Sequence, residues 1–281
     1  MVEANQVVNE KVETSFKHLN AKTKLTHTNA TVADKIDNDG IDCHGNLGAV
    51  QWTGTGTVAV FNCENPIQFT PALGLIKGHS GHIQDIAWSP FDNHLLATCA
   101  DDGKAKFWMF EGDEGTTQKL NTHITEADLE IEAHARKCLG VKWHRAAENL
   151  IATHSIDKTI KLFDVDSPDE PAACFTDLKD FCTQIEWSPD GKMIGGVTKG
   201  KSFIAADPRT ESLAYSFAIH KGPKQQRCSW VDDYTVVTSG FDSEAQRQFG
   251  VWDIRNPEQA LAMGPLIEGT GIPYMWFDRE Y

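Results

Sequence analysis

Apolar and polar positions alternate in short runs along most of this chain, and turn-forming residues separate the runs. In the clearest stretch, residues 77–108, an alternating run covers 83–88 and a small apolar run covers 95–98. A tight turn and a second alternating run over 104–108 follow. Alternation with a period of two is typical of β-strands, whereas helices repeat every 3.6 residues. The stretch therefore predicts three short strands.

The same unit recurs along the chain. Each copy has an alternating apolar run that ends in tryptophan, and these tryptophans lie 43 to 55 positions apart. They are Trp88, Trp143, Trp187, Trp230 and Trp276. Periods in the forties are typical of four-stranded propeller blades. The Gly78-His79 opening and the closing Trp108 of the first clear copy are typical of a WD40 repeat.

We therefore predict an all-β WD40 β-propeller of about five blades plus the start of a sixth. Residues 1–14 are expected to be a flexible lead-in, and 15–281 the incomplete propeller. The expected blades are 28–75, 76–130, 131–174, 175–217, 218–265 and a partial blade at 266–281. Propellers protect their sheet edges by closing into a ring. An unclosed ring indicates a truncated chain, or a gap covered by another chain or by unusual packing.

Two local features refine this layout. The Thr-Gly-Thr-Gly sequence at 53–56 lies between two apolar runs and predicts a hairpin in the first blade. Residues 111–132 are rich in Asp and Glu and lengthen the first spacing between tryptophans. We expect this insert to be a solvated loop that follows a completed blade. The alternative is an acidic arm that docks a basic partner.

Polar residues at fixed places in the repeat predict a hydrogen-bond network within each blade. A histidine near the first strand, a hydroxyl, and an aspartate in the turn can connect to the closing tryptophan. The expected structural residues are His79, Asp102, Trp108, His134, Ser155, Asp157, His220 and Trp252. Ala100 takes the hydroxyl position in the second blade and Phe163 the closing position in the third, so we expect no blade to have the complete network.

The net charge of −14 disfavours nucleic acids and anionic membranes as general partners. No run of apolar residues is long enough for a transmembrane segment, and the acidic, polar N-terminus shows no leader. Seven cysteines, none in a CxxC pair, are expected to be reduced and buried. These features predict a cytoplasmic protein.

Two motifs resemble a phosphate-binding loop and a metal site, but their context and spacing do not support either function. Residues 195–202 match the phosphate-binding pattern GxxxxGK[ST], which requires a strand before it and a helix after it. Here the repeat predicts a β-turn and a short strand. Cys43, His44 and Cys63 match no zinc spacing. We expect no catalytic residue, no metal and no cofactor, and hence no enzyme.

Several phrases resemble the coronin family more specifically. They are 15–18 (SFKH), 78–90, 206–209 (ADPR), 238–253 with its Arg-Gln before Val-Trp-Asp, and 271–278. Coronins are seven-bladed WD40 propellers that bind filamentous actin and work with the actin-branching complex and cofilin. The resemblance therefore implies an actin-filament-binding, non-catalytic scaffold of the actin cytoskeleton.

Actin has an acidic surface, so a partner of this net charge needs a local basic face. The candidate contacts are Lys17, Lys22, Lys24 and Lys35. The family's first-blade Ile-Arg-Val has its nearest equivalent in Ala30-Thr31-Val32, which lacks the arginine. The alternative function is a general WD40 adaptor that binds peptides at a propeller face and does not bind actin.

Overall fold

The structure is a computed structural model that describes residues 40–63, 74–110, 122–266, 269 and 271–273. All the regular structure in these ranges is β, and it forms five four-stranded antiparallel sheets. The prediction of an all-β propeller is confirmed. No helix in the described ranges is long and apolar enough to cross a membrane.

Each sheet is one blade, and its strands follow one another in the sequence. Blade 1 contains β1 (Ile41–His44), β2 (Leu47–Gln51), β3 (Val58–Asn62) and β4 (Leu75–Ile76). Blade 2 contains β5 (Ile83–Trp88), β6 (Leu95–Ala100), β7 (Ala105–Met109) and β8 (Leu129–Ile131). Blade 3 contains β9 (Cys138–Trp143), β10 (Leu150–Ser155), β11 (Ile160–Asp164) and β12 (Ala173–Phe175). Blade 4 contains β13 (Cys182–Trp187), β14 (Ile194–Thr198), β15 (Ser202–Asp207) and β16 (Ser212–Ala218). Blade 5 contains β17 (Arg227–Trp230), β18 (Thr235–Phe241), β19 (Arg247–Asp253) and β20 (Ala262–Pro265).

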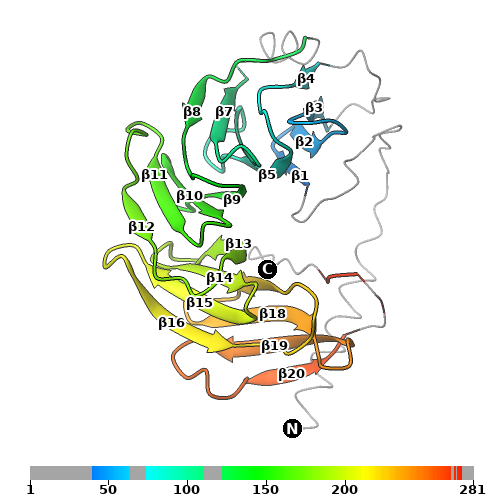
Figure 1. Cartoon of the computed structure of the whole chain (residues 1–281), viewed down its shortest axis with the longest axis vertical. Coiled ribbons are helices and arrows are strands. Elements are labelled where there is room, and N and C mark those ends of the chain that lie inside the picture. The colour runs from blue at the N-terminus through cyan, green and yellow to red at the C-terminus, as the bar shows by residue number, and fades with distance from the viewer. Residues whose placement is uncertain (1–39, 64–73, 111–121, 267–268, 270, 274–281) are drawn as a thin grey trace.

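The five blades follow one another along an open curve (Figure 1), and we call the inner side of this curve the channel. The first strand of each blade lies beside the first strand of the next, so β1, β5, β9, β13 and β17 form the inner wall. The last strands, β8, β12, β16 and β20 among them, lie at the outer rim (Figure 1). Neighbouring blades share apolar clusters, for example Val60 of blade 1 with Trp88 of blade 2. The core therefore lies between the sheets, and its burial stabilises the stacking of the blades.

The repeated tryptophans connect the blades. Trp143 donates its indole N–H to the carbonyl of Ala87, 3.0 Å away in the preceding blade. Trp187 donates to the carbonyl of Lys142 at 3.4 Å, and Trp230 to that of Glu186 at 3.1 Å. Each acceptor is the residue just before the tryptophan of the preceding blade. Each repeated tryptophan thus packs its ring between two sheets and donates its indole N–H to a backbone carbonyl of the neighbouring blade.

Polar side chains of the inner strands make a second set of connections. Asp42 accepts a hydrogen bond from the backbone N–H of Trp88 at 2.7 Å. Buried Asp85 accepts one from the N–H of Val141 at 3.2 Å. Gln184 bridges to both backbone groups of Cys228, at 2.9 and 3.2 Å. Each bond joins one blade to the next, so the inner wall is held by side chains as well as by packing.

The predicted hairpin at 53–56 is confirmed, because β2 and β3 pair antiparallel on either side of it. The prediction for the acidic insert is wrong at its C-terminal end. Leu129–Ile131 forms β8, the fourth strand of blade 2. Its acidic Glu130 forms ion pairs with Lys106 on β7 and with Lys104 in the turn before β7. The sequence pattern did not reveal this strand, because the strand is short and acidic residues surround it.

The phosphate-loop pattern at 195–202 lies in β14, a turn and β15, with no helix. The rejection of that motif on its context is thus correct. All seven cysteines are free thiols, and four are buried, but the expectation of burial is wrong for Cys43, which is exposed on β1. The lead-in at 1–14 lies outside the described residues, as do eleven of the sixteen residues at 266–281.

Candidate functional site

Blade 2 contains a complete hydrogen-bond network. His79 contacts the Asp102 carboxylate through Nδ1 at 3.0 Å and the Thr98 hydroxyl through Nε2 at 2.8 Å. The same hydroxyl accepts the indole N–H of Trp108 at 2.9 Å. Because a carboxylate can only accept, Nδ1 of His79 donates to Asp102, and in the neutral ring Nε2 then accepts from Thr98. This buried chain connects the entry turn of the blade to its closing aromatic residue.

The prediction that Ala100 breaks this network is wrong, because Thr98 supplies the hydroxyl two residues earlier. Blade 3 shows the same register, in which Thr153 and not Ser155 contacts His134, at 3.0 Å. Side chains alternate across a strand, so both positions face the same side, and the sequence alone does not distinguish them. Ser155 instead accepts the backbone N–H of Asp157 at 3.1 Å.

The other blades vary the network. In blade 3, Asp157 lies 3.1 Å from His134 Nδ1, but Phe163 pairs with Ile151 where a tryptophan would stand and offers no donor. In blade 5, Thr238 joins His220 to Trp252, at 2.9 and 2.8 Å, and the Gln248 amide replaces the aspartate. Blade 4 has Gly196 in the threonine position, so it lacks the hydroxyl.

The charges of these groups follow from their surroundings. Partial burial acts to raise the pKa of Asp102. The hydrogen bonds from His79 and from the N–H groups of Lys104 and Ser80 outweigh it and hold that pKa well below its ordinary range. Burial lowers the pKa of His134 to about 4, against the opposing effect of Asp157, and that of His220 to about 4. His134 and His220 are therefore neutral at physiological pH and act as hydrogen-bonding spacers.

The ends of the inner strands surround two cavities. One, of about 340 Å³, lies where β5, β9 and β13 end, beside Trp88, Trp143 and Trp187. The other, of about 330 Å³, lies where the same strands begin, at the opposite mouth of the channel. The first has a mixed lining of Asp42, Glu186 and basic side chains. The second has no Asp or Glu among the residues that line it.

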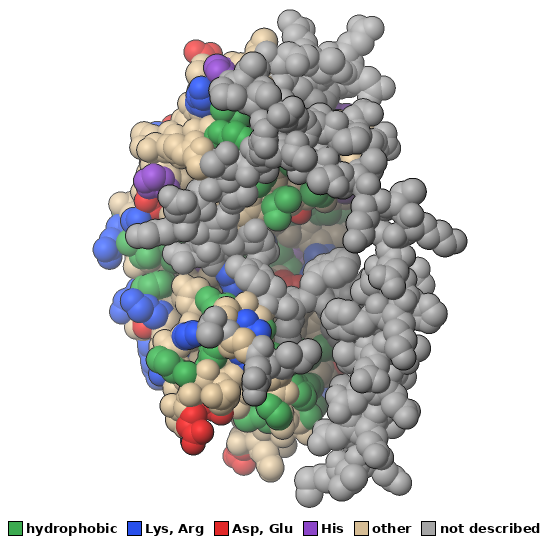
Figure 2. All heavy atoms as spheres, turned by 90° about the vertical axis from the view of Figure 1, so that its right-hand side faces the viewer, with side chains coloured by type: hydrophobic (Ala, Val, Ile, Leu, Met, Phe, Trp, Pro, Cys, Tyr) green, Lys and Arg blue, Asp and Glu red, His purple; other side chains and the backbone are tan. Residues whose placement is uncertain are grey.

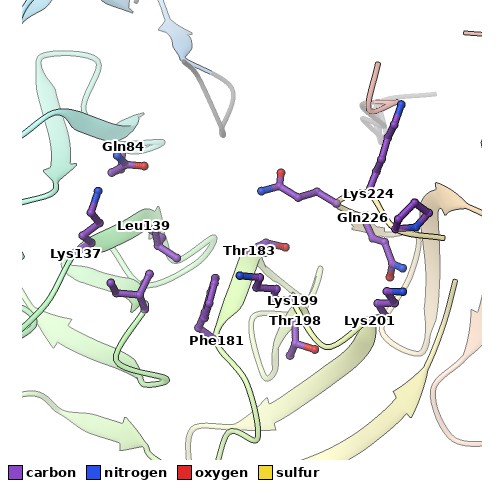
Figure 3. Close-up of a pocket in the computed structure, with 13 residues that line it drawn as sticks. Gln84, Lys137, Leu139, Phe181, Thr183, Thr198, Lys199, Lys201, Lys224 and Gln226 are labelled. Carbon is purple, nitrogen blue, oxygen red and sulfur yellow. The ribbon is translucent and has the colours of Figure 1, made fainter. Parts of the chain in front are cut away.

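Four lysines line this second cavity, which we call the lysine cavity (Figure 3). Lys137 precedes β9, Lys199 and Lys201 lie in the turn between β14 and β15, and Lys224 precedes β17. Lys137 and Gln84 lie on one side and Lys201, Lys224 and Gln226 on the other, with Phe181 and Lys199 between them (Figure 3). Three blades and their entry loops thus bring cations together at one mouth.

The lysines are held by different contacts. Lys137 forms an ion pair with Asp101 at 2.8 Å. Lys199 lies 5.3 Å from the centre of the Phe181 ring, and Lys224 lies 4.8 Å from that of Phe241. Lys201 donates to the carbonyl of Lys221 at 3.0 Å. Aromatic faces and carbonyls orient an ammonium group without cancelling its charge.

Comparisons with known proteins agree with this architecture. The family model for the WD domain, G-beta repeat, matches residues 71–109. The coronin-like protein of Saccharomyces cerevisiae is 29% identical over 92% of this chain, and human Coronin-2A is 22% identical over 81%. The crystal structure of the WD40 domain from Toxoplasma gondii coronin matches 91% of this chain and 66% of its own, with a TM-score of 0.82 and 25% identity.

The chain is similar to coronins over most of its length and has the fold of a coronin WD40 domain. The resemblance drawn from short phrases is confirmed over most of the sequence. The chain spans 41% of the yeast relative and 43% of human Coronin-2A.

The predicted basic contacts of the coronin-like chain, Lys17, Lys22, Lys24 and Lys35, lie outside the described residues. The lysine cavity was not predicted. Its cations are far apart in the sequence and meet only when the inner strands align. One signal was present, because Lys199 and Lys201 belong to the motif rejected as a phosphate loop.

The structure also shows how the three residues considered as metal ligands in the sequence lie relative to one another. Cys43 and Cys63 bring their sulfur atoms to 3.9 Å, but His44 follows Cys43 directly on β1 and faces the other side of the sheet. Among the described residues, no three His, Cys, Asp or Glu side chains form a group that could hold a metal.

Proposed function

We propose that this coronin-like chain binds filamentous actin as a non-catalytic interaction scaffold. The observation that carries the proposal is the similarity to coronins, which extends over 92% of the chain in the yeast relative. The WD40 fold supports it, because a stack of sheets joined by Trp143, Trp187 and Trp230 presents loops from a rigid frame. Binding through such a surface requires no reacting group.

The same resemblance suggests the setting in which the chain works. We place it in the cytoplasm, at the actin cytoskeleton, with the actin-branching complex and cofilin as further partners. Because the net charge is −14, approach to an acidic filament requires a local basic face. Lys17, Lys22, Lys24 and Lys35 are the proposed contacts on that face.

Co-sedimentation with actin filaments tests the proposal. The wild-type chain is expected to pellet with filaments at low salt and less at moderate salt, because salt screens exposed ion pairs. Changing the four N-terminal lysines to Glu is expected to abolish pelleting at both salt concentrations.

A control with the same total charge separates local contact from general repulsion. It carries Lys158→Glu, Lys179→Glu, Lys192→Glu and Lys221→Glu, four exposed lysines of blades 3 to 5 and their turns. Pelleting of the control but not of the N-terminal variant supports the proposed face. A folded wild-type chain that stays in the supernatant at low salt refutes actin binding. Equal loss in both variants refutes the assignment to these lysines.

A further inference from the structure

We infer that a cavity beside the loop that enters blade 4 binds a small linear amine, with the ammonium group of the amine against Asp177 and Asp180. The cavity has a volume of about 220 Å³, and we call it the blade 4 cavity. Its lining comes from the loop at 177–180 and from β14, β15 and β16 with their turns. The inference goes beyond filament binding and does not rest on it, because it follows from a comparison of the blades with one another.

Blade 4 lacks a lysine that the two preceding blades share. Lys106 on β7 and Lys161 on β11 occupy one position of the repeat, and Ile204 on β15 occupies it in blade 4. The turn before each strand establishes the match, because a residue with positive φ stands three positions earlier in all three blades, at Gly103, Lys158 and Lys201. The lysine donates its Nζ to the carbonyl of Gly78 at 2.9 Å in blade 2, and to that of Ala133 at 2.8 Å in blade 3. Ile204 has no such donor.

The loop that enters blade 4 has two carboxylates that the matching loops at 78–82 and 133–137 lack. Asp177 stands five residues before β13, as Gly78 stands five residues before β5. Asp177 and Asp180 both line the cavity, and within the described residues neither forms an ion pair with Lys or Arg. Lys and Arg gather elsewhere, for example along one edge of the face shown in Figure 2, whereas the lining has one cation, the exposed Lys179. The cavity therefore has two anions where its own blade supplies no lysine, and a cationic ligand fits it.

The remaining lining fits the methylene chain of an amine. The network positions of His134 and Asp157 are taken in blade 4 by Leu178 and Gly200, and both of these line the cavity. Apolar side chains and hydroxyls complete the lining, namely Leu178, Ile204 and Leu213 with Ser202 and Ser216. Lysine side chains lie in the same way, with the stem on apolar surface and the charged head at polar groups. No third metal-ligating side chain joins the two aspartates in the described part of the chain, so an amine suits the cavity better than a metal ion.

Isothermal titration calorimetry with cadaverine, a pentane chain with an ammonium group at each end, tests the inference with the full chain and without actin. The wild-type chain is expected to bind cadaverine, more weakly at about 300 mM than at about 50 mM salt. It is expected not to bind the diol of the same chain length. Asp177→Asn and Asp180→Asn are each expected to weaken binding roughly twofold to fivefold, the range for partly exposed ion pairs.

Asp169→Asn is the matched control, because it removes the same charge at an exposed position in the turn between β11 and β12, outside the cavity lining. It is expected to leave the affinity for cadaverine unchanged. Absence of cadaverine binding by the wild-type chain, equal affinity for the diol, or equal weakening by Asp169→Asn overturns the inference. Displacement of cadaverine by equimolar Mg²⁺ also overturns it, in favour of a metal ion.

Ile204→Lys tests the comparison between blades directly. Its tethered ammonium group is expected to take the place that Lys106 and Lys161 occupy in their blades, so that cadaverine no longer binds. Ile204→Leu keeps the volume of the side chain without the charge and is expected to retain binding. Thermal unfolding checks that each variant is folded, and cadaverine binding by folded Ile204→Lys at wild-type affinity overturns the inference. The two aspartate variants test the site even if Ile204→Lys does not fold, and the filament assay is independent of all these outcomes because actin is absent.

Discussion

The indole nitrogen of Trp143 lies 3.0 Å from the carbonyl oxygen of Ala87, which belongs to the preceding blade. Two further tryptophans repeat this relationship along the inner wall. The bond forms between two sheets and is buried, so water does not compete for either group. One residue type at one position of the repeat thus supplies both packing area and registry between blades.

Trp143→Phe is expected to destabilise the fold beyond the loss of ring volume. The change removes the buried hydrogen bond from the indole to the Ala87 carbonyl, which contributes about 0.5–1.5 kcal/mol. Trp88→Phe is the matched control. Trp88 is equally buried and packs on an aromatic ring, as Trp143 does, but its Nε1 has no hydrogen-bond partner among the described residues. Urea unfolding measures both variants, and equal losses of stability would contradict the role of the bond.

The hydroxyl of Thr98 is expected to matter more than its counterpart in blade 3. Thr98→Val removes the partner of both His79 and Trp108, so two buried groups lose a bond, at about 2–4 kcal/mol in total. Thr153→Val removes the contact with His134 but no indole bond, because Phe163 has no donor, and each threonine also loses one long bond to a backbone carbonyl of the next strand. We expect about half the loss there, measured by urea unfolding. A larger effect at Thr153 would be inconsistent with this network.

Much of the fold could be predicted from the sequence because the repeat carries it locally. A tryptophan after each alternating run marks the end of an inner strand, at Trp88, Trp143, Trp187 and Trp230 alike. The register of the hydrogen-bonding side chains within a blade was harder to predict. Thr98 and Ala100 share a face of β6, and only the pairing of β6 with β5 and β7 decides which one reaches His79.

The candidate site could be predicted least. Its lysines come from separate turns, and their meeting depends on how blades 2 to 5 stack around the channel. No local sequence pattern indicates that residues 137 and 224 lie at the same cavity. The one clue, Lys199 with Lys201, was a motif whose usual strand-to-helix context was missing. Recognising cations there did not require that context, only the knowledge that the turn lies at the channel mouth.

Gly103 is expected to tolerate no side chain. Its φ is +79°, and a Cβ would lie 2.3 Å from the backbone oxygen of His134. Gly103→Ala is therefore expected to cost about 2 kcal/mol or more, since strain and a backbone clash add. Gly200→Ala is the control, because the nearest heavy atom to its Cβ would be 3.6 Å away. Thermal unfolding should show Gly200→Ala near wild type, and an unchanged Gly103→Ala would show that this turn can rearrange.

Stability is expected to fall as the pH drops from about 6.5 towards 4. Burial lowers the pKa of His154 to about 3, and burial lowers that of His134 to about 4. In the unfolded chain these groups titrate near 6.5. Between the two values the unfolded state binds more protons than the folded state, so acid favours unfolding. For His154 the loss between pH 7 and pH 5 is about 2 kcal/mol.

Carboxylates do not account for this window. The pKa of Asp190 is lowered to about 2, because its hydrogen bonds from Lys192 and Ser188 outweigh the effect of burial. Its contribution is therefore lost only as the pH falls below about 4. Urea unfolding at pH 7, 6 and 5 measures the histidine effect as a slope. His154→Gln, which keeps a donor for the carbonyl of Cys182 that lies 3.1 Å from His154, is expected to flatten that slope whatever its effect at pH 7. A wild-type stability that stays constant from pH 7 to pH 5 would mean that the buried histidines are protonated without cost.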